Sequence, residues 1–329
     1  MGMISTPARR LAMTVATLLV AVGGTSSYGQ QFPTRPISII WPYSSGSTTD
    51  TFLRLTAAEA AKTLGQVVTI ESRSGAIGRL GLNALPSAPK DGHFLVGVST
   101  GELVTHGLAD ATLRLEPRKD YVPVIGLFNN YLMLIAHPSL PARDLKGLIA
   151  YARANPGKLN FSSGATGGPA HLTLEFLKMQ TGVDIVYVAY RGSVQSTMAL
   201  ATGEVQLNVS DSNSAKSLID TGKAVGIAAV SPDRMRTLPN LPTMAEGGLP
   251  GFSTETFIGF IAPAGTPSAV IATLNNAFAG AIRSPTVAAK VEAAGYVVTG
   301  NSPDQFYGQI KAAEESLGPV VRKMKLKFE

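Results

Sequence analysis

The sequence contains no cysteine in 329 residues. Disulfide bonds, thiolate metal sites and a cysteine nucleophile are therefore excluded. The four histidines do not have metal-ligand spacing, and no aspartate-rich loop resembles a calcium site. We therefore expect no metal and no other cofactor. Basic residues are scattered except near the C-terminus, and no basic stripe alternates with aromatic residues, so nucleic acid is not expected as a partner.

Long apolar segments are absent except near the N-terminus. Arg9 and Arg10 precede an apolar stretch from Leu11 to Val22, and small residues follow at 27–29. This pattern is typical of a secretory signal peptide, and the stretch is too short for a membrane-spanning helix, which needs about 20 apolar residues. We predict a signal peptide at 1–29, cleaved near Gly29, and a mature chain of about 300 residues in the periplasm.

The net charge and the length of the mature chain indicate the kind of solute and the number of lobes. The net charge of +6 becomes +4 when Arg9 and Arg10 are removed, because residues 1–29 contain no acidic residue. A mild positive potential would help to attract an acidic solute. A chain of this length is also expected to divide into two lobes.

Apolar segments of strand length alternate with segments of helical spacing, which predicts an α/β fold. We expect chain crossings near residues 129 and 252, with one lobe formed by 30–128 plus 253–329 and the other by 129–252. Two details follow from local patterns: Met198 should face inward on a short helix, and Pro319 should kink or restart the last helix. Strands are expected at 67–71, 94–98, 122–127, 131–136, 185–188, 205–209, 225–230 and 257–262.

Two strand–loop–helix junctions have the same composition. In the first, a strand at 36–43 leads through a Ser/Thr/Gly-rich loop at 44–50 into a helix at 51–64. In the second, a strand at 158–161 leads through the loop 162–170 into a helix at 171–181. A helix N-terminus has unpaired N–H groups and positive partial charge, which favour a carboxylate or a phosphate. Two such junctions, over a hundred residues apart, predict two lobes that hold one acidic molecule.

These junctions lie within a longer series of matching fragments. The fragments include Pro33-Thr-Arg-Pro-Ile37, Trp41-Pro-Tyr43, Ala88-Pro-Lys-Asp-Gly92, His137-Pro-Ser-Leu-Pro141, Ala154-Asn-Pro-Gly-Lys158, Tyr190-Arg-Gly192, Gly248-Leu-Pro-Gly-Phe252 and Ala262-Pro-Ala-Gly-Thr-Pro267. Their order resembles that of the Bug-type solute-binding proteins of tripartite tricarboxylate transporters, over essentially the whole mature chain.

The resemblance implies a two-lobed periplasmic-binding-protein fold (a Venus flytrap, type II-like) with the ligand cleft between the lobes. It further implies a small organic acid as ligand and the membrane subunits of such a transporter as partners. The loops at 44–50 and 162–171 would hold one carboxylate, largely through backbone amides and water. The chain departs from the family pattern at Ser44-Ser-Gly-Ser47, where Pro-Gly-Gly is frequent, and at Phe257, where tryptophan is common.

The candidate ligand-binding residues come from these loops and from other strand ends. They are Tyr43, Ser44, Ser45, Gly46, Ser47, Thr48, Thr49, Asp50, Ser99, Thr100, Ser163, Gly164, Ala165, Thr166, Gly167, His171, Tyr190, Arg191, Asp211 and Phe257. Several have a structural alternative: Asp50 as a helix cap, which is favoured, and His171 as a structural hydrogen-bonding group. Arg191 could pair with a ligand carboxylate or point to solvent. Phe257 is expected in the core first.

Two other functions fit parts of the sequence. Ser99 lies in Gly97-Val-Ser-Thr-Gly101, the form of a hydrolase nucleophile elbow, but no histidine sits in a recognisable triad context. We therefore expect a binding protein and not an enzyme, with a secreted serine hydrolase as the alternative. A binding protein that signals to a receptor is a further alternative, because uptake and sensing would use the same two lobes.

Overall fold

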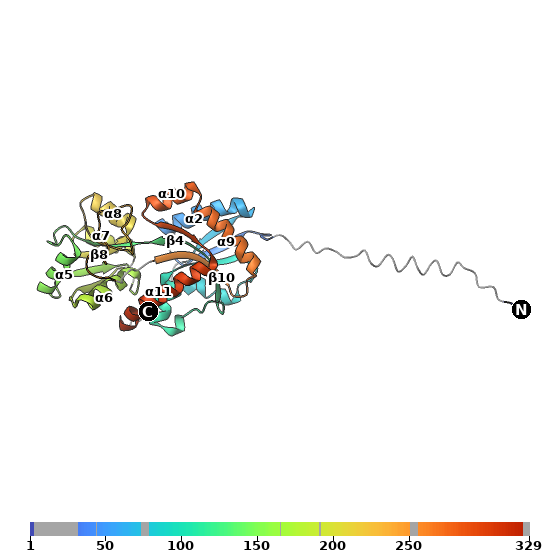
Figure 1. Ribbon diagram of the computed structural model, residues 1–329, viewed down its shortest axis with the longest axis horizontal. Helices are drawn as coiled ribbons and strands as arrows, with labels where there is room; N and C mark the ends of the chain where they lie inside the picture. The colour runs from blue at the N-terminus through green and yellow to red at the C-terminus, as the bar shows by residue number, and fades with distance from the viewer. Residues whose placement is uncertain are drawn as a thin grey trace.

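The computed structural model describes residues 1–2, 32–43, 45–73, 79–164, 166–190, 192–250 and 256–324. It has two α/β lobes that lie side by side along the long axis of the molecule (Figure 1). Each lobe is built on its own β-sheet, with helices packed against it. The two-lobed α/β fold predicted from the sequence is confirmed.

The sheet of the first lobe has six strands in the order β11-β4-β10-β3-β1-β2. The three strands at one side are parallel, and the others pair antiparallel. The strands are β1 (Ile37–Trp41), β2 (Val68–Ser72), β3 (Phe94–Ser99), β4 (Tyr121–Asn130), β10 (Thr256–Pro263) and β11 (Val297–Asn301).

The sheet of the second lobe has five strands in the order β7-β6-β8-β5-β9. Here β6 is parallel to both β7 and β8, whereas β5 is antiparallel to β8 and β9. The strands are β5 (Leu132–Ala136), β6 (Asn160–Ser163), β7 (Val186–Ala189), β8 (Leu207–Asp211) and β9 (Val225–Val230).

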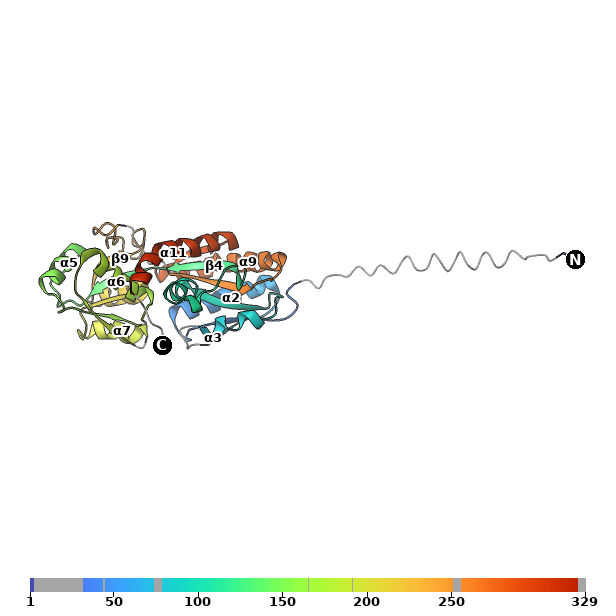
Figure 2. The ribbon, with the colours of Figure 1, turned by 90° about the horizontal axis from the view of Figure 1, so that it is seen from below.

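The helices complete both lobes, as Figure 2 shows from a second direction. In the described part of the chain, no helix combines the length and the apolarity that a membrane crossing would need. The helices are α2 (Thr48–Leu64), α3 (Arg79–Leu82), α4 (His106–Ala109), α5 (Leu145–Ala154), α6 (Pro169–Thr181), α7 (Ser193–Ala201), α8 (Ser212–Asp220), α9 (Ser268–Ile282), α10 (Pro285–Ala293) and α11 (Pro303–Met324), with a π-helical turn at Gly101–Thr105 and 3₁₀ turns at Leu85–Ser87 and Ala111–Leu113.

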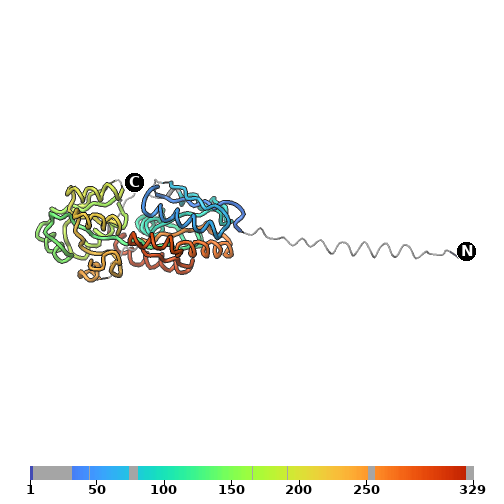
Figure 3. The backbone as a smooth tube through the Cα atoms, turned by 90° about the horizontal axis from the view of Figure 1, so that it is seen from above, coloured from blue at the N-terminus to red at the C-terminus, as the bar shows by residue number. Residues whose placement is uncertain are grey.

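The chain crosses between the sheets in a way that fixes which strand ends face each other. Strand β4 ends at Asn130 in the first sheet, and β5 begins at Leu132 in the second. Asn130 pairs with Thr256 at the start of β10, and β10 runs antiparallel to β3, so the carboxyl ends of β1 and β3 face the second lobe. Leu132 pairs with Asp211, so the carboxyl ends of β8 and its parallel neighbour β6 face the first lobe. The backbone trace in Figure 3 shows the same side-by-side arrangement.

Helix α2 illustrates how the sequence produces these elements. Leu53, Ala57 and Ala60 recur at helical spacing and are buried, with exposed fractions of 1% or less. They pack in one cluster with apolar side chains of β1, and the helix ends at Gly65, whose φ of 67° is left-handed. Glycine is favoured there because it has no Cβ to clash in that conformation.

Helix α11 connects the two lobes. It packs against β4 in the first lobe, against the π-helical turn beside β3, and against α6 in the second lobe. Phe306 and Val321 of α11 belong to the same hydrophobic cluster as Leu172 and Phe176 of α6. The two lobes are thus joined by apolar packing as well as by chain crossings.

Some local predictions were wrong. Helices α2 and α6 begin earlier than predicted, at Thr48 and Pro169, and β6 continues through Ser163, which the sequence pattern placed in the loop. Met198 is 59% exposed, because α7 buries a different face formed by Ser196, Ala199 and Leu200. Helix α11 continues through Pro319 to Met324, so it does not restart there, and the alternative of a kink at Pro319 stays a prediction.

Candidate ligand-binding site

The first loop ends in a capped helix start at the edge that faces the second lobe. Ser47 is the N-cap of α2, and its Oγ accepts the N–H of Asp50 at 3.1 Å. Asp50 itself lies in the first turn, so the prediction that Asp50 caps the helix was wrong. Its carboxylate instead accepts the N–H of Gly46 at 2.9 Å, which closes the loop back on the helix. This exchange resembles a capping box, in which loop and helix donors are satisfied reciprocally.

The negative charge of Asp50 is compensated by a partner within the first lobe. The residue is 3% exposed and its Oδ2 lies 3.0 Å from Nε of Arg54, one helical turn further on. Burial alone would raise the pKa of Asp50, but the hydrogen bonds from Arg54 and Gly46 outweigh it and hold the pKa below its ordinary value. Arg54 also donates to the carbonyl of Ile70 at 3.0 Å, which ties α2 to β2. The Asp50–Arg54 pair therefore stabilises the loop and adds little net charge to the cleft.

Tyr43 and Ser99 meet at the neighbouring ends of β1 and β3. Their hydroxyl oxygens are 3.0 Å apart, and both side chains hydrogen-bond to the carboxylate of Glu102. Ser99 is 4% exposed and Glu102 is 1% exposed, whereas Tyr43 is 38% exposed. Burial of the hydroxyl and the nearby Glu102 carboxylate raise the pKa of Tyr43 well above its ordinary value. Glu102 was not among the residues predicted from the sequence.

Thr100 and Phe257 lie in the core beneath this edge. Thr100 is 2% exposed, and its hydroxyl oxygen accepts the N–H of Phe257 at 3.1 Å. Phe257 is 1% exposed, and its ring meets Phe306 of α11 edge-on, with ring centres 5.3 Å apart. The structure therefore places these two candidate residues behind the cleft edge, where they link β3, β10 and α11.

The second loop leads into a helix start without a capping side chain. Gly168 is the N-cap of α6 and Pro169 is its first residue. Proline is well suited to this position because its missing N–H would have no intrahelical acceptor. The N–H of Gly167 donates to Nδ1 of His171 at 3.0 Å, so His171 holds the loop against the first turn.

The surroundings of His171 keep its ring neutral. The residue is 7% exposed and its ring stacks on Tyr187, with centres 3.8 Å apart and planes 8° apart. Burial lowers the pKa of His171 from 6.5 to about 4, although Glu175 acts in the opposite direction. Since Nδ1 accepts a hydrogen bond from Gly167, the proton of the neutral ring is on Nε2. His171 thus shapes the loop through a hydrogen bond.

Gly164 is required by close backbone packing. A Cβ at this position would lie 2.4 Å from the backbone carbon of Gly192 and 2.4 Å from the backbone nitrogen of Ser193. The N–H of Gly192 donates to the Gly164 carbonyl at 3.0 Å, and that of Tyr190 to the Ser163 carbonyl at 2.9 Å. The second loop is therefore fastened to the segment between β7 and α7.

Tyr190 and Asp211 both have partners within the second lobe. The Tyr190 hydroxyl donates to Oε1 of Glu204 at 2.8 Å; burial and this carboxylate raise the pKa of Tyr190. Asp211 is the N-cap of α8 and accepts the N–H of Ser214 at 3.1 Å. Three further candidates, Ser44, Ala165 and Arg191, lie outside the residues that the structure describes.

The two lobes touch at one rim of the cleft. The hydroxyl of Ser212, at the start of α8, donates to the carbonyl of Ala294 in the first lobe at 3.0 Å. Next to it, Tyr296 hydrogen-bonds to the side chain of Thr49 in the first turn of α2. Burial and the charge of Asp211 raise the pKa of Tyr296. Sequence reasoning placed Ser212 near the cleft, at a strand end, but missed Ala294 and Tyr296, because no motif marks a contact between segments 82 residues apart.

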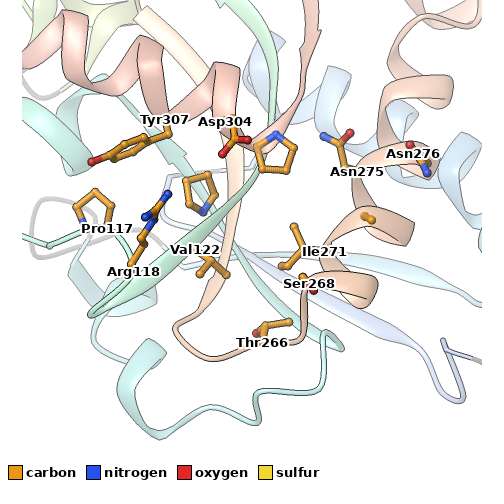
Figure 4. Close-up of a pocket in the computed structure, with 13 residues that line it drawn as sticks. Pro117, Arg118, Val122, Thr266, Ser268, Ile271, Asn275, Asn276, Asp304 and Tyr307 are labelled. Atoms are coloured by element: carbon orange, nitrogen blue, oxygen red, sulfur yellow. The ribbon is translucent and has the colours of Figure 1, made fainter. Parts of the chain in front are cut away.

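A separate cavity of about 380 Å³ lies in the first lobe, between β4, α9 and α11. Figure 4 shows Arg118 and Tyr307 on one side of it and Asn275 and Asn276 on the other. None of the candidate ligand residues lines it. Its apolar walls and distance from the loops give no reason to move the candidate site away from the facing strand ends. Within the described part of the chain, no cluster of three or more metal-ligating side chains occurs.

Comparison with known proteins identifies the family. The model of the tripartite tricarboxylate transporter family receptor matches residues 52–326. This chain belongs to that family. Protein BugT of Bordetella pertussis is 30% identical over 320 residues, covering 96% of this chain and 98% of BugT. The resemblance to Bug-type proteins read from the sequence is confirmed.

Solved structures agree with this family assignment. R. palustris Rpa4515 with adipate has a TM-score of 0.79 and 32% identity, covering 88% of this chain and 98% of that chain. MatC from Rhodopseudomonas palustris with bound malate has a TM-score of 0.78 and 29% identity, covering 88% and 100%. The periplasmic binding protein BugD has a TM-score of 0.77 and 26% identity, covering 89% and 98%. The chain is therefore similar to one periplasmic binding protein and to two proteins that were solved with adipate or malate.

Proposed function

We propose that this receptor captures a small organic acid between its lobes in the periplasm and delivers it to the membrane subunits of a tripartite tricarboxylate-type transporter. The observation that carries the proposal is the facing arrangement of the two loops, which follow β1 and β6 at opposing strand ends. Its support is the family membership and the adipate and malate in similar structures. The N-terminal signal expected from the sequence supports export.

Backbone amides are the groups we propose for holding the carboxylate. In the first loop, the N–H groups of Gly46 and Asp50 are already used inside the loop, which leaves those of Thr48 and Thr49 at the first turn of α2. In the second loop, Gly168 brings no capping side chain, so the N–H groups of Ala170 and His171 are the natural donors. The partial positive charge of two helix starts would then balance the ligand charge.

The polar side chains beside these amides suit a mainly neutral site. The pair Asp50–Arg54 is internally balanced, and the low pKa of His171 keeps that ring uncharged at neutral pH. The ligand would bridge the loops and favour the closed arrangement of the lobes. Contacts between Ser212 and Ala294 would then form part of the closed state.

We further propose that the protein has no catalytic activity. The alternative, a hydrolase with Ser99 as nucleophile, requires an accessible hydroxyl activated by a histidine base. Ser99 is 4% exposed, and its hydroxyl donates to Glu102 at 2.7 Å. This arrangement favours a structural role for Ser99 at the cleft edge.

A ligand screen tests the proposed binding function. Thermal shift of ligand-free protein is measured with aliphatic dicarboxylates, hydroxy acids, amino acids and aromatic acids, and hits are confirmed by calorimetry. A ligand at 100 times its Kd should raise the free energy of unfolding by about 2.7 kcal/mol. Absence of stabilisation by any acid would contradict the proposal. Ester hydrolysis that disappears in Ser99→Ala would contradict the absence of catalysis.

Delivery needs a second measurement. Uptake of the identified acid is followed in cells that contain the membrane subunits, with the receptor present or deleted. Uptake that requires the receptor is expected. Unchanged uptake, together with a receptor-dependent transcriptional response to the acid, would support the sensing alternative.

A further inference from the structure

The corner formed by Tyr43, Ser99 and Glu102 lies at the cleft edge of the first lobe. Tyr43 follows β1 by two residues, Ser99 ends β3, and these two strands pair directly. Glu102 lies in the π-helical turn after β3. Both strand ends face the second lobe, and Tyr43 leads directly into the first ligand loop. A ligand held between the loops would therefore extend past this corner.

The hydrogen bonds of the corner fix where its protons point. Glu102 accepts the N–H of Ser99 at 2.8 Å, the O–H of Ser99 at 2.7 Å and the O–H of Tyr43. The two hydroxyl oxygens are also 3.0 Å apart, within hydrogen-bond distance, so the single proton of each hydroxyl is used inside the corner, toward Glu102 or toward the other hydroxyl. The oxygens of Tyr43 and Ser99 therefore present lone pairs and no donor to a ligand. The Ser99 oxygen already accepts the N–H of Gly101 at 3.1 Å, so the Tyr43 oxygen is the better acceptor; Tyr43 is 38% exposed as a residue, but its hydroxyl end is buried beside Glu102, and a ligand donor would have to reach that end from the cleft.

The charge of Glu102 adds a second preference. The N–H of Ser99 and the hydroxyls of Ser99 and Tyr43, which donate to Glu102, are all neutral, and Glu102 is 1% exposed. A buried negative charge acts strongly on nearby groups, because the surrounding dielectric is low. A second carboxylate of a ligand would be repelled at this corner. An ammonium group would be attracted, and a hydroxyl would gain a hydrogen bond.

We propose that this corner selects acids that carry a hydrogen-bond donor, in the order ammonium, hydroxyl, methylene. The loops would hold one carboxylate, and the donor on the ligand would meet the oxygens of Tyr43 and Ser99 under the influence of Glu102. This inference rests on the proposed function, since it assumes that the loops hold the acid. It assigns Glu102 a positioning role: the side chain acts through the two hydroxyl groups that it orients.

Matched ligands test the order. Calorimetry compares succinate, malate and aspartate, and then the five-carbon series glutarate, 2-hydroxyglutarate and glutamate, on wild-type protein. We expect the amino acid of the better-bound series to bind at least tenfold more tightly than the plain dicarboxylate, with the hydroxy acid between them. Equal or tighter binding of the plain dicarboxylate would overturn the inference while leaving the proposed function intact. Binding of no acid in this or the broader screen would overturn both.

Two variants test the role of Glu102. Glu102→Gln removes the charge and keeps one acceptor oxygen, while its NH2 group would donate to the hydroxyl on the other side, and it should reduce the tenfold discrimination to less than threefold. Glu59→Gln removes a charge from the exposed pair with Lys62 on α2 and serves as the matched control, with discrimination unchanged. Tyr43→Phe removes the acceptor oxygen of Tyr43 together with its hydrogen bond to Glu102 but keeps the carboxylate, and it should have the same effect if Glu102→Gln does not fold. Full discrimination in a folded Glu102→Gln or Tyr43→Phe protein would overturn the assignment.

Discussion

Ser212 and Ala294 lie in different lobes and are joined by one hydrogen bond, from Ser212 Oγ to the Ala294 carbonyl, at 3.0 Å. Ser212 is 1% exposed. The neighbouring Gly295 is tightly enclosed, since a Cβ there would lie 2.6 Å from Ser212 Oγ. Ser212 directly follows Asp211, the N-cap of α8. Tyr296 hydrogen-bonds to Thr49, in the first turn of α2 directly after the first ligand loop. The contact between the lobes therefore lies beside a candidate ligand loop, so that closing the lobes and positioning this loop are linked.

Ser212→Ala should loosen the closed arrangement. The variant removes one neutral hydrogen bond, with a net contribution of roughly 0.5–1.5 kcal/mol, and leaves the Ala294 carbonyl without this donor. If the contact belongs to the closed state, ligand affinity should fall about two- to tenfold. Small-angle scattering should also show a larger average radius in the ligand-free variant.

The control is Ser316→Ala, because the hydroxyl of Ser316 donates only within its own helix, to the Ala313 carbonyl. Affinity and radius should match the wild type in this control. If Ser212→Ala also leaves both quantities unchanged, the contact does not contribute to closure.

The two loop glycines should respond differently to alanine. Gly46 has a φ of 87° and no atom within 4 Å of an added Cβ, so Gly46→Ala should cost only the left-handed strain, about 1–2 kcal/mol. Gly164→Ala would place Cβ 2.4 Å from backbone atoms of Gly192 and Ser193, which cannot move independently. We expect the second variant to lower the melting temperature more and to lose acid binding. Chemical denaturation and calorimetry measure both effects, and a milder Gly164→Ala would show that the β7–α7 segment shifts easily.

His171 should make stability depend on pH. Its pKa in the folded state, about 4, is below its ordinary value of 6.5, so the folded protein favours the neutral ring. The associated stabilisation is fully present above pH 6.5 and is lost as the pH falls towards 4, by at most roughly 3 kcal/mol. Protonation of Nδ1 would also break the hydrogen bond from Gly167, so the affinity for the ligand should fall over the same pH range.

His171→Gln isolates this effect from other titrating groups. The difference in unfolding free energy between wild type and variant is measured from pH 7.5 to 4. The wild-type advantage should shrink as the pH falls, because glutamine does not titrate. A constant difference in unfolding free energy across this pH range would show that burial of His171 does not govern the loss of stability at low pH.

The sequence was sufficient for the architecture and for the two loops, because alternating apolar segments and Ser/Gly-rich strand ends are local signals. It was insufficient where the determinant is a contact distant in sequence. Thr100 was expected to touch the ligand, but it is 2% exposed and its hydroxyl accepts the N–H of Phe257, which lies in the core as expected. Glu102 is the only charged residue of its turn, and only the pairing of β1 with β3 brings Tyr43 to it.

Prediction from local sequence patterns also failed for helices and strands that bury few large apolar side chains. No sequence pattern indicated α10, whose buried residues are only Val287 and Val291, or β11, whose residues are largely half-buried or exposed. The same limitation explains Met198, because α7 buries small residues that do not form a distinct apolar stripe. These elements depend on packing against the rest of the lobe.

Deleting a single hydroxyl group should have different effects in the two ligand loops. Ser47 is the N-cap of α2, so Ser47→Ala should lower the free energy of unfolding by about 1 kcal/mol, within a usual range of roughly 0.5–2 kcal/mol. Thr166 is exposed, and its hydroxyl lies 3.4 Å from that of Tyr187. Thr166→Ala should therefore change stability by less than about 0.5 kcal/mol.

The effect on affinity distinguishes backbone from side-chain recognition. If amides of the first turn hold the acid, Ser47→Ala weakens binding indirectly, because loss of the cap allows Thr48 and Thr49 to fray. Replacement by aspartate, another good cap, should then restore stability. It should not restore affinity fully, since it adds a negative charge beside the bound acid. Calorimetry on both Ser47 variants and Thr166→Ala measures this. A large affinity loss in Thr166→Ala, with stability unchanged, would show that a side-chain hydroxyl binds the acid directly and that backbone amides are not sufficient.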